Sequence, residues 1–161
     1  MDAEKEEQDI IVQIAKKFKN IDVYLPKLKK LVKAVCSRYK LAKTTVSIAI
    51  VGDSEMRKIN KQFLNRNSTT DCLSFNLSDN DTQSPKSFEL VVNAEKAIKE
   101  ANLRGHSSET ELALYITHGL LHNLGFDDST RHQAEKMHQT EDEILQQLGF
   151  GLVYNKSTRH L

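Results

Sequence analysis

The chain has no tryptophan, only two prolines and only two cysteines among its 161 residues. Two cysteines do not form the dense disulfide framework of small secreted proteins, and the apolar neighbours of Cys36 and Cys72 favour buried free thiols. No apolar stretch approaches the roughly 20 residues that a membrane-spanning helix requires. Residues 1–9 lack the basic and apolar regions of a signal peptide. These absences favour a cytoplasmic protein without a membrane anchor.

A large net charge is also missing, because the formal balance is +1. The whole chain therefore does not have the charge typical of a nucleic-acid-binding protein. Basic residues do cluster locally, between residues 16 and 43. The favoured interpretation is the solvated face of an amphipathic helix, and the alternative is a surface for RNA phosphates.

The composition, 39% hydrophobic and 28% charged, is that of an ordinary globular domain. We expect one folded domain at residues 10–150, with a disordered tail at 1–9 and a C-terminal tail at 151–161. Apolar patterning predicts strands at 10–14, 45–51, 72–77 and 90–92, and a mobile loop at 78–87. It predicts helices at 24–39, 53–63, 94–102, 108–124 and 130–148. The expected fold is α/β (α+β-like), a small mixed four-stranded sheet packed by about five helices.

The most informative residues are His118 and His122, which lie four residues apart in the helix predicted at 108–124. Four residues is just over one helical turn, so both imidazoles can reach one metal ion. The helix is expected to begin at Ser108, with Glu111 completing a capping box, and to end at the glycine turn of Gly125.

Beyond that turn, Asp128 can supply a third ligand from the loop. Three protein ligands with an open position are typical of a catalytic zinc site. Asp127 and His132 are rival third ligands. The sequence thus predicts a divalent transition-metal site, with zinc as the expected ion.

Gly119 bears on the kind of chemistry that this site performs. Zinc peptidases with the pattern H-E-x-x-H carry their general base directly after the first histidine. Glycine has no side chain to act as a base, so peptide hydrolysis is disfavoured. The position indicates close packing or room for a substrate.

This run of residues resembles the YbeY family of rRNA-maturation endoribonucleases. Six positions of the family signature H-G-x-L-H-L-x-G-Y/F-x-H are matched, and Asp128 stands in place of its last histidine. A second block, from Ile59 to Phe63 and from Thr70 to Phe75, resembles the family's L-N-R-x-Y-R and P-T-D-V-L-S-F segments. The matching residues of the first run are His118, Gly119, Leu121, His122, Gly125 and Phe126.

The resemblance implies a metal-dependent endoribonuclease that prefers single strands and acts in small-subunit rRNA processing. Its expected partners are rRNA precursors and the small ribosomal subunit with its proteins, and the expected oligomeric state is a monomer. It also implies substrate-binding roles for Asn60, Asp71 and Ser74. The family's arginine after Y/F falls on Leu64, so we assign the cationic catalytic roles to Lys61 and Arg66.

Two other functions remain open from the sequence. The replacement of the arginine and of the last histidine is compatible with a ribosome-associated RNA-binding factor whose metal is structural. A metallopeptidase is a third and weaker interpretation, which rests only on two histidines carried by a helix.

Overall fold

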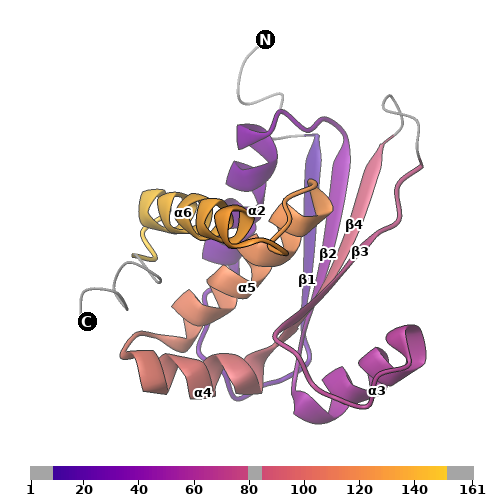
Figure 1. Ribbon diagram of the computed structural model, residues 1–161, viewed down its shortest axis with the longest axis vertical. Coiled ribbons are helices and arrows are strands. Elements are labelled where there is room, and N and C mark those ends of the chain that lie inside the picture. Colours follow the sequence, from indigo (N-terminus) through magenta and orange to yellow (C-terminus); the bar gives the residue numbers. More distant parts are fainter. Residues whose placement is uncertain (1–8, 80–84, 152–161) are drawn as a thin grey trace.

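The computed structural model of the protein describes residues 9–79 and 85–151, which form one α+β domain. Its elements follow the order expected from the sequence (Figure 1). They are β1 (Ile10–Lys16), α2 (Leu25–Arg38), β2 (Thr44–Val51), α3 (Asp53–Leu64), β3 (Cys72–Asn76), β4 (Lys86–Asn93), α4 (Ala94–Arg104), α5 (Ser108–Asn123) and α6 (Arg131–Gln147). The predicted tails at 1–9 and 151–161, apart from Asp9 and Gly151, and the centre of the predicted loop lie outside the described residues.

The four strands form one mixed sheet in the order β1-β2-β4-β3. β1, β2 and β4 run parallel to one another, and β3 pairs antiparallel with β4 at the edge. The prediction of a small mixed four-stranded sheet with five helices is confirmed.

One face of the sheet carries the main core. Alternate residues of the central strand β2, namely Val46, Ile48 and Ile50, are buried on this face, as the two-residue period of a strand requires. α2 and α5 pack against it, and α6 lies across α5 on the far side (Figure 1). α5 is therefore enclosed between the sheet and another helix.

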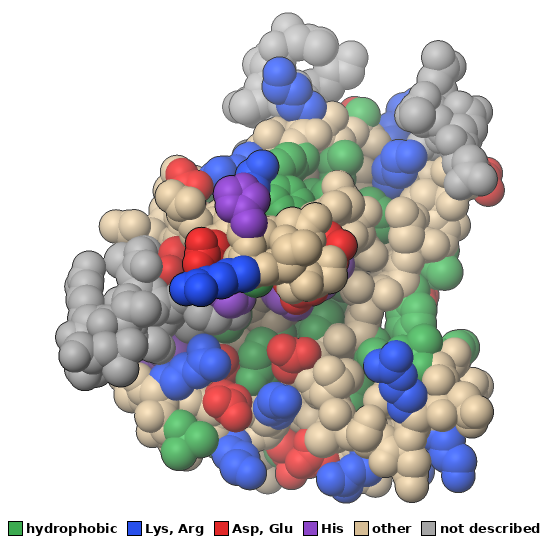
Figure 2. All heavy atoms as spheres, viewed as in Figure 1, with side chains coloured by type: hydrophobic (Ala, Val, Ile, Leu, Met, Phe, Trp, Pro, Cys, Tyr) green, Lys and Arg blue, Asp and Glu red, His purple; other side chains and the backbone are tan. Residues whose placement is uncertain are grey.

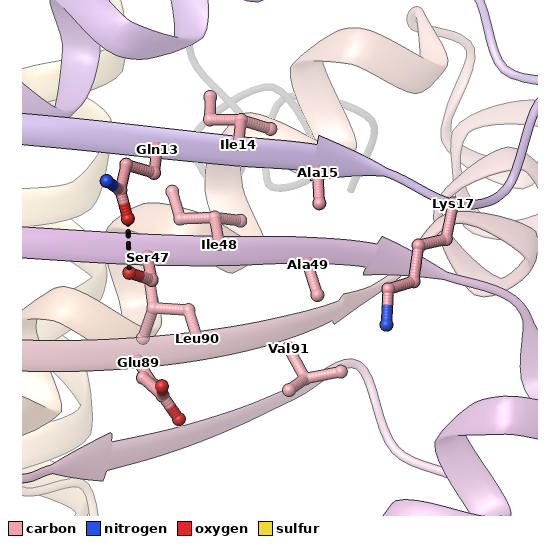
Figure 3. Close-up of a pocket in the computed structure, with 10 residues that line it drawn as sticks. All are labelled: Gln13, Ile14, Ala15, Lys17, Ser47, Ile48, Ala49, Glu89, Leu90 and Val91. Carbon is pink, nitrogen blue, oxygen red and sulfur yellow. Dashed lines mark hydrogen bonds between the residues drawn. The ribbon is translucent and has the colours of Figure 1, made fainter.

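The opposite face is covered only in part. α3 packs there over a second small cluster formed by Val51, Met56 and Leu73. Beyond α3, Gln13 and Ser47 share a hydrogen bond of 3.3 Å at the wall of an open groove of about 370 Å³ (Figure 3). This difference between the faces leaves Gln13 exposed and Ser47 partly exposed on the outward side of β1 and β2.

Two boundaries differ from the sequence prediction. β4 begins at Lys86 rather than at residue 90, because its pairing with β2 extends back to Thr44. The N-cap of α5 is Ser107 rather than Ser108, and its hydroxyl accepts a hydrogen bond from the Thr110 backbone N–H. The expected capping box with Glu111 is therefore wrong, and the Glu111 side chain is buried instead.

The cysteines and the helices can be compared with what the composition predicts. Both cysteines are free; Cys36 is buried, and its burial raises the pKa of the thiol to about 11. Cys72 is only partly buried as a residue. Among the described helices, none combines the length and the apolar character needed to cross a membrane.

Gly119 lies where α5 contacts β3 and β4. A Cβ atom at this position would stand 2.7 Å from the Cys72 Sγ atom and 2.9 Å from the Leu90 Cδ2 atom. Cβ atoms essentially never approach neighbours so closely, so a side chain here would displace the Cys72 and Leu90 side chains or push α5 away from β3 and β4. Of the two sequence interpretations of Gly119, close packing is the one that the geometry supports.

We expect Gly119→Ala to lower the free energy of unfolding by about 1–2 kcal/mol, because the cost of overpacking exceeds the gain in helix propensity. Denaturant unfolding measures this change. In the background of Cys72→Ala, which removes the nearest atom, the loss should shrink by at least about 0.5 kcal/mol. An equal loss in both backgrounds would contradict the proposed clash.

Candidate metal centre

The last two turns of α5 bring His118 and His122 together. Their ring centroids lie 4.5 Å apart, and the two Nε2 atoms face each other at 3.0 Å. The spacing of four residues places both side chains on one face of the helix, as the sequence predicts.

Each ring is oriented by a hydrogen bond at its other nitrogen. Nδ1 of His118 lies 2.7 Å from a carboxylate oxygen of Glu141, and Nδ1 of His122 lies 3.1 Å from the Phe126 carbonyl oxygen. A carbonyl oxygen only accepts, so the proton of a neutral His122 resides on Nδ1. Both rings thus offer the lone pair of Nε2 to the same point, an arrangement common among metal-binding histidines.

Asp128 reaches this point from the loop after α5. The chain turns at Gly125, whose φ of +99° is accessible mainly to glycine. The Oδ2 atom of Asp128 then lies 3.7 Å from Nε2 of His118 and 3.6 Å from Nε2 of His122. These separations define a point about 2.0 Å from all three atoms, the distance at which zinc binds nitrogen and carboxylate oxygen. The three residues therefore fit one metal ion.

The rival ligands are turned elsewhere. Asp127 accepts hydrogen bonds from the backbone N–H groups of Asp128 and Ser129 and from the Ser129 hydroxyl. These bonds, led by that of the hydroxyl, lower the pKa of the Asp127 carboxyl. His132 is exposed in the first turn of α6. Within residues 9–79 and 85–151, only His118, His122 and Asp128 form a group whose ligand atoms all lie within 4.8 Å of one another.

Burial and charge act in opposite directions on His118. Desolvation disfavours the charged ring, but the hydrogen bond and charge of Glu141, with the charges of Asp71 and Asp128, raise its pKa above the ordinary value. Glu141 is fully buried, and desolvation raises its pKa despite the bond to His118. A metal ion at Nε2 would supply the positive charge that this buried pair favours.

Glu141 is the functional residue that the sequence reasoning missed. It lies on α6, 23 residues after His118, and belongs to the buried side of that helix together with Met137 and Ile144. A carboxylate within an apolar stripe was the available signal, because a buried acid requires a partner.

Two of the predicted substrate-binding residues lie beside the centre. Ser74 on β3 faces Gly119, and Asp71 lines a cavity that also reaches His118. The segment that carries Asp71 is held by Asn93, whose side chain donates to the Thr69 hydroxyl and to the Thr70 carbonyl.

The other predicted residues lie on α3 and in the loop that follows. Asn60 is buried and donates to the Ser68 carbonyl oxygen at 2.9 Å, so its side chain shapes the loop. Lys61 and Arg66 are exposed, and Leu64 at the end of α3 is 46% exposed. Asn60, Lys61 and Arg66 are not among the described residues that line the cavity next to His118.

The centre is open to solvent. The side chains of His118, His122 and Asp128 are 22%, 32% and 43% exposed. Structural zinc sites are closed by four protein ligands, whereas catalytic sites keep a position for water or substrate. Three partly exposed donors correspond to the catalytic arrangement.

Comparison with known proteins identifies the family of this chain. The family model described as Endoribonuclease YbeY matches residues 11–149. The chain belongs to the YbeY family. It is 30% identical to Endoribonuclease YbeY of Heliobacterium modesticaldum over 69% of this chain and 74% of the relative. It is 29% identical to Endoribonuclease YbeY of Ureaplasma urealyticum over 86% of this chain and 90% of the relative.

A solved structure has a similar fold. The solution structure of a Thermotoga maritima protein superposes with a TM-score of 0.57 at 22% identity, covering 85% of this chain and 91% of the other. The resemblance expected from the two sequence motifs is thus confirmed at the level of the family. Against the YbeY signature, Asp128 remains a departure, and the structure directs it toward both histidines.

We expect Glu141→Gln to weaken metal binding about tenfold, because an amide oxygen accepts the hydrogen bond of the His118 N–H without supplying negative charge. Glu141→Ala should weaken it further, toward about 100-fold. Competition with a chromophoric chelator measures the affinity. Glu143→Gln, on the exposed side of the same helix, is the matched control. Equal affinity in Glu141→Gln, Glu143→Gln and the unaltered protein would contradict the role of Glu141.

Proposed function

We propose that this chain is a metal-dependent endoribonuclease that prefers single-stranded RNA and acts in the maturation of small-subunit rRNA. The observation that carries the proposal is an open group of three donors, in a member of a family of endoribonucleases. The proposed partners are rRNA precursors and the small ribosomal subunit.

The proposed ion is zinc, held by His118, His122 and Asp128. Two imidazoles and one carboxylate are ligands that zinc accepts, and catalytic zinc sites commonly have three protein ligands. When bound, a divalent ion supplies Lewis acidity toward a phosphodiester and charge that offsets the phosphate.

The residues of the chain set the electrostatics around that ion. Asp128 brings a negative charge where the family signature has a neutral histidine, so a divalent ion here has a net charge of about +1 with its ligands. Glu141 holds the His118 ring in place with its proton on Nδ1. Asp127 keeps the loop turned so that Asp128, rather than Asp127, faces the histidines.

The alternatives have less support. A structural metal fits poorly with three partly exposed donors, because closed sites are the rule for that role. Zinc peptidases of the H-E-x-x-H kind have a carboxylate next to the first histidine, and Gly119 packs there against Cys72 instead. The nuclease is therefore preferred over both.

Cleavage of a single-stranded fragment of an rRNA precursor by the purified, metal-loaded chain tests the proposal. We expect cleavage to fall by at least about 100-fold when a chelator removes the metal, and equally in His122→Ala and Asp128→Ala, because each loses a ligand. Metal content, measured on the same samples, should fall in both variants.

Asp127→Asn is the matched control. An amide oxygen at this position still accepts the backbone hydrogen bonds of the loop, but the carboxylate is gone. This variant should keep both its metal and its cleavage activity. Metal loss in Asp127→Asn with retention in Asp128→Ala would assign the third ligand to Asp127. Unchanged cleavage in His122→Ala would disprove the nuclease proposal.

Leu64 offers a test of the missing arginine. Because Leu64 is exposed near the end of α3, Leu64→Arg should be tolerated by the fold. We expect this variant to raise kcat/KM for RNA cleavage about tenfold, because a guanidinium stabilises charge on phosphate oxygens. Leu103→Arg, which adds the same charge at an exposed site on α4, should leave kcat/KM within about twofold. Equal effects of the two substitutions would mean that the added net charge, and not the position of the arginine, raises kcat/KM.

A further inference from the structure

A polar cavity of about 250 Å³ lies beside the metal centre. Its wall is built by α4, α5 and the residue that precedes β3. His118 belongs both to this wall and to the metal-ligand group, so cavity and centre are contiguous. The side chains that line the cavity are Asp71, Lys96, Glu100, Arg104, Glu111, Leu114, Tyr115 and His118.

The charges of the cavity are arranged in pairs of opposite sign. Glu111 is buried and contacts His106 and Arg104, and Arg104 also lies 3.8 Å from Glu100. Figure 2 shows acidic and basic side chains close together over the part of the surface where Figure 1 draws α4. The lining holds three carboxylates and two cationic side chains, so it does not attract a phosphate. Its chemistry suits a neutral group rich in hydroxyls.

Tyr115 presents a polar group that nothing in the described chain satisfies. The residue is 4% exposed, and its hydroxyl oxygen is buried with no hydrogen-bond partner among the described residues. A buried hydroxyl without a partner costs about 1–3 kcal/mol of desolvation. Burial, followed by the charges of Glu111 and Asp71, raises the pKa of the phenol, so the hydroxyl remains protonated and available as a donor.

We propose that this cavity binds the ribose of the nucleotide adjacent to the phosphate at the metal centre, with the Tyr115 hydroxyl hydrogen-bonded to a sugar hydroxyl. The proposal rests on the nuclease function proposed above. A ribose is bonded directly to its phosphate, so a cavity that shares His118 with the centre lies next to the place where the sugar must be. The 2′-hydroxyl distinguishes RNA from DNA, and Tyr115 thus determines specificity for RNA.

Competition between RNA and DNA tests this assignment. A labelled single-stranded RNA is cleaved by the metal-loaded chain in the presence of unlabelled RNA or DNA of the same sequence, and the competitor concentration that halves the rate is measured. The unaltered protein should require more DNA than RNA. In Tyr115→Phe the value for RNA should rise about 3- to 10-fold, the effect of one hydrogen bond, while the value for DNA stays unchanged.

Two controls separate recognition from stability. Tyr115→Phe removes an unsatisfied hydroxyl, so its melting temperature should be equal or higher, which a purely structural role of the hydroxyl would not predict. Tyr24→Phe, at an exposed tyrosine on the N-cap of α2, should leave both competitor values unchanged. Cleavage with an unaltered RNA-to-DNA ratio in Tyr115→Phe would overturn the ribose assignment alone. Absence of cleavage by the unaltered protein would overturn the nuclease function and the assignment with it.

Discussion

The close contact between α5 and the sheet is the constraint on which the rest of the structure depends. Gly119 allows α5 to pack closely against β3 and β4. This close packing fixes the distance between the sheet and the neighbouring residues of α5. A helix this deeply enclosed presents few side chains to solvent, and the partly exposed ones lie in its first turn and in its histidine turns. The fold therefore fixes the position of the metal centre before any ion binds.

The residues of α5 that line the cavity or belong to the metal-ligand group follow one line along the helix. Glu111, Tyr115, His118 and His122 are separated by three or four residues, so they lie on one face. Each of the two histidines is held from outside α5 or from beyond its end, by α6 in one case and by the turn in the other. Orientation of the ligands is thus a property of the assembled domain, not of the helix alone.

Much of the fold could be predicted because its patterns are local. The strand at 45–51 alternates, and the glycine at 125 ends α5 with a positive φ, as expected. The His-x-x-x-His spacing likewise fixes a shared helix face without tertiary information. The start of β4 was not predictable in this way, because its first residues form a strand only through pairing with β2. Glu141 and Tyr115 belong to the same category, since their environments are created by contacts between elements.

The three metal ligands are close together in the sequence, within eleven residues. An ion can therefore also bind them in the unfolded chain, where closing so short a loop costs little entropy. Stabilisation by a ligand depends on the difference between its affinities for the two states. In this domain that difference would come from the long-range partner Glu141 and from the enclosed helix. An ion bound by the proposed ligands would therefore depend on correct tertiary packing more than it would stabilise the fold.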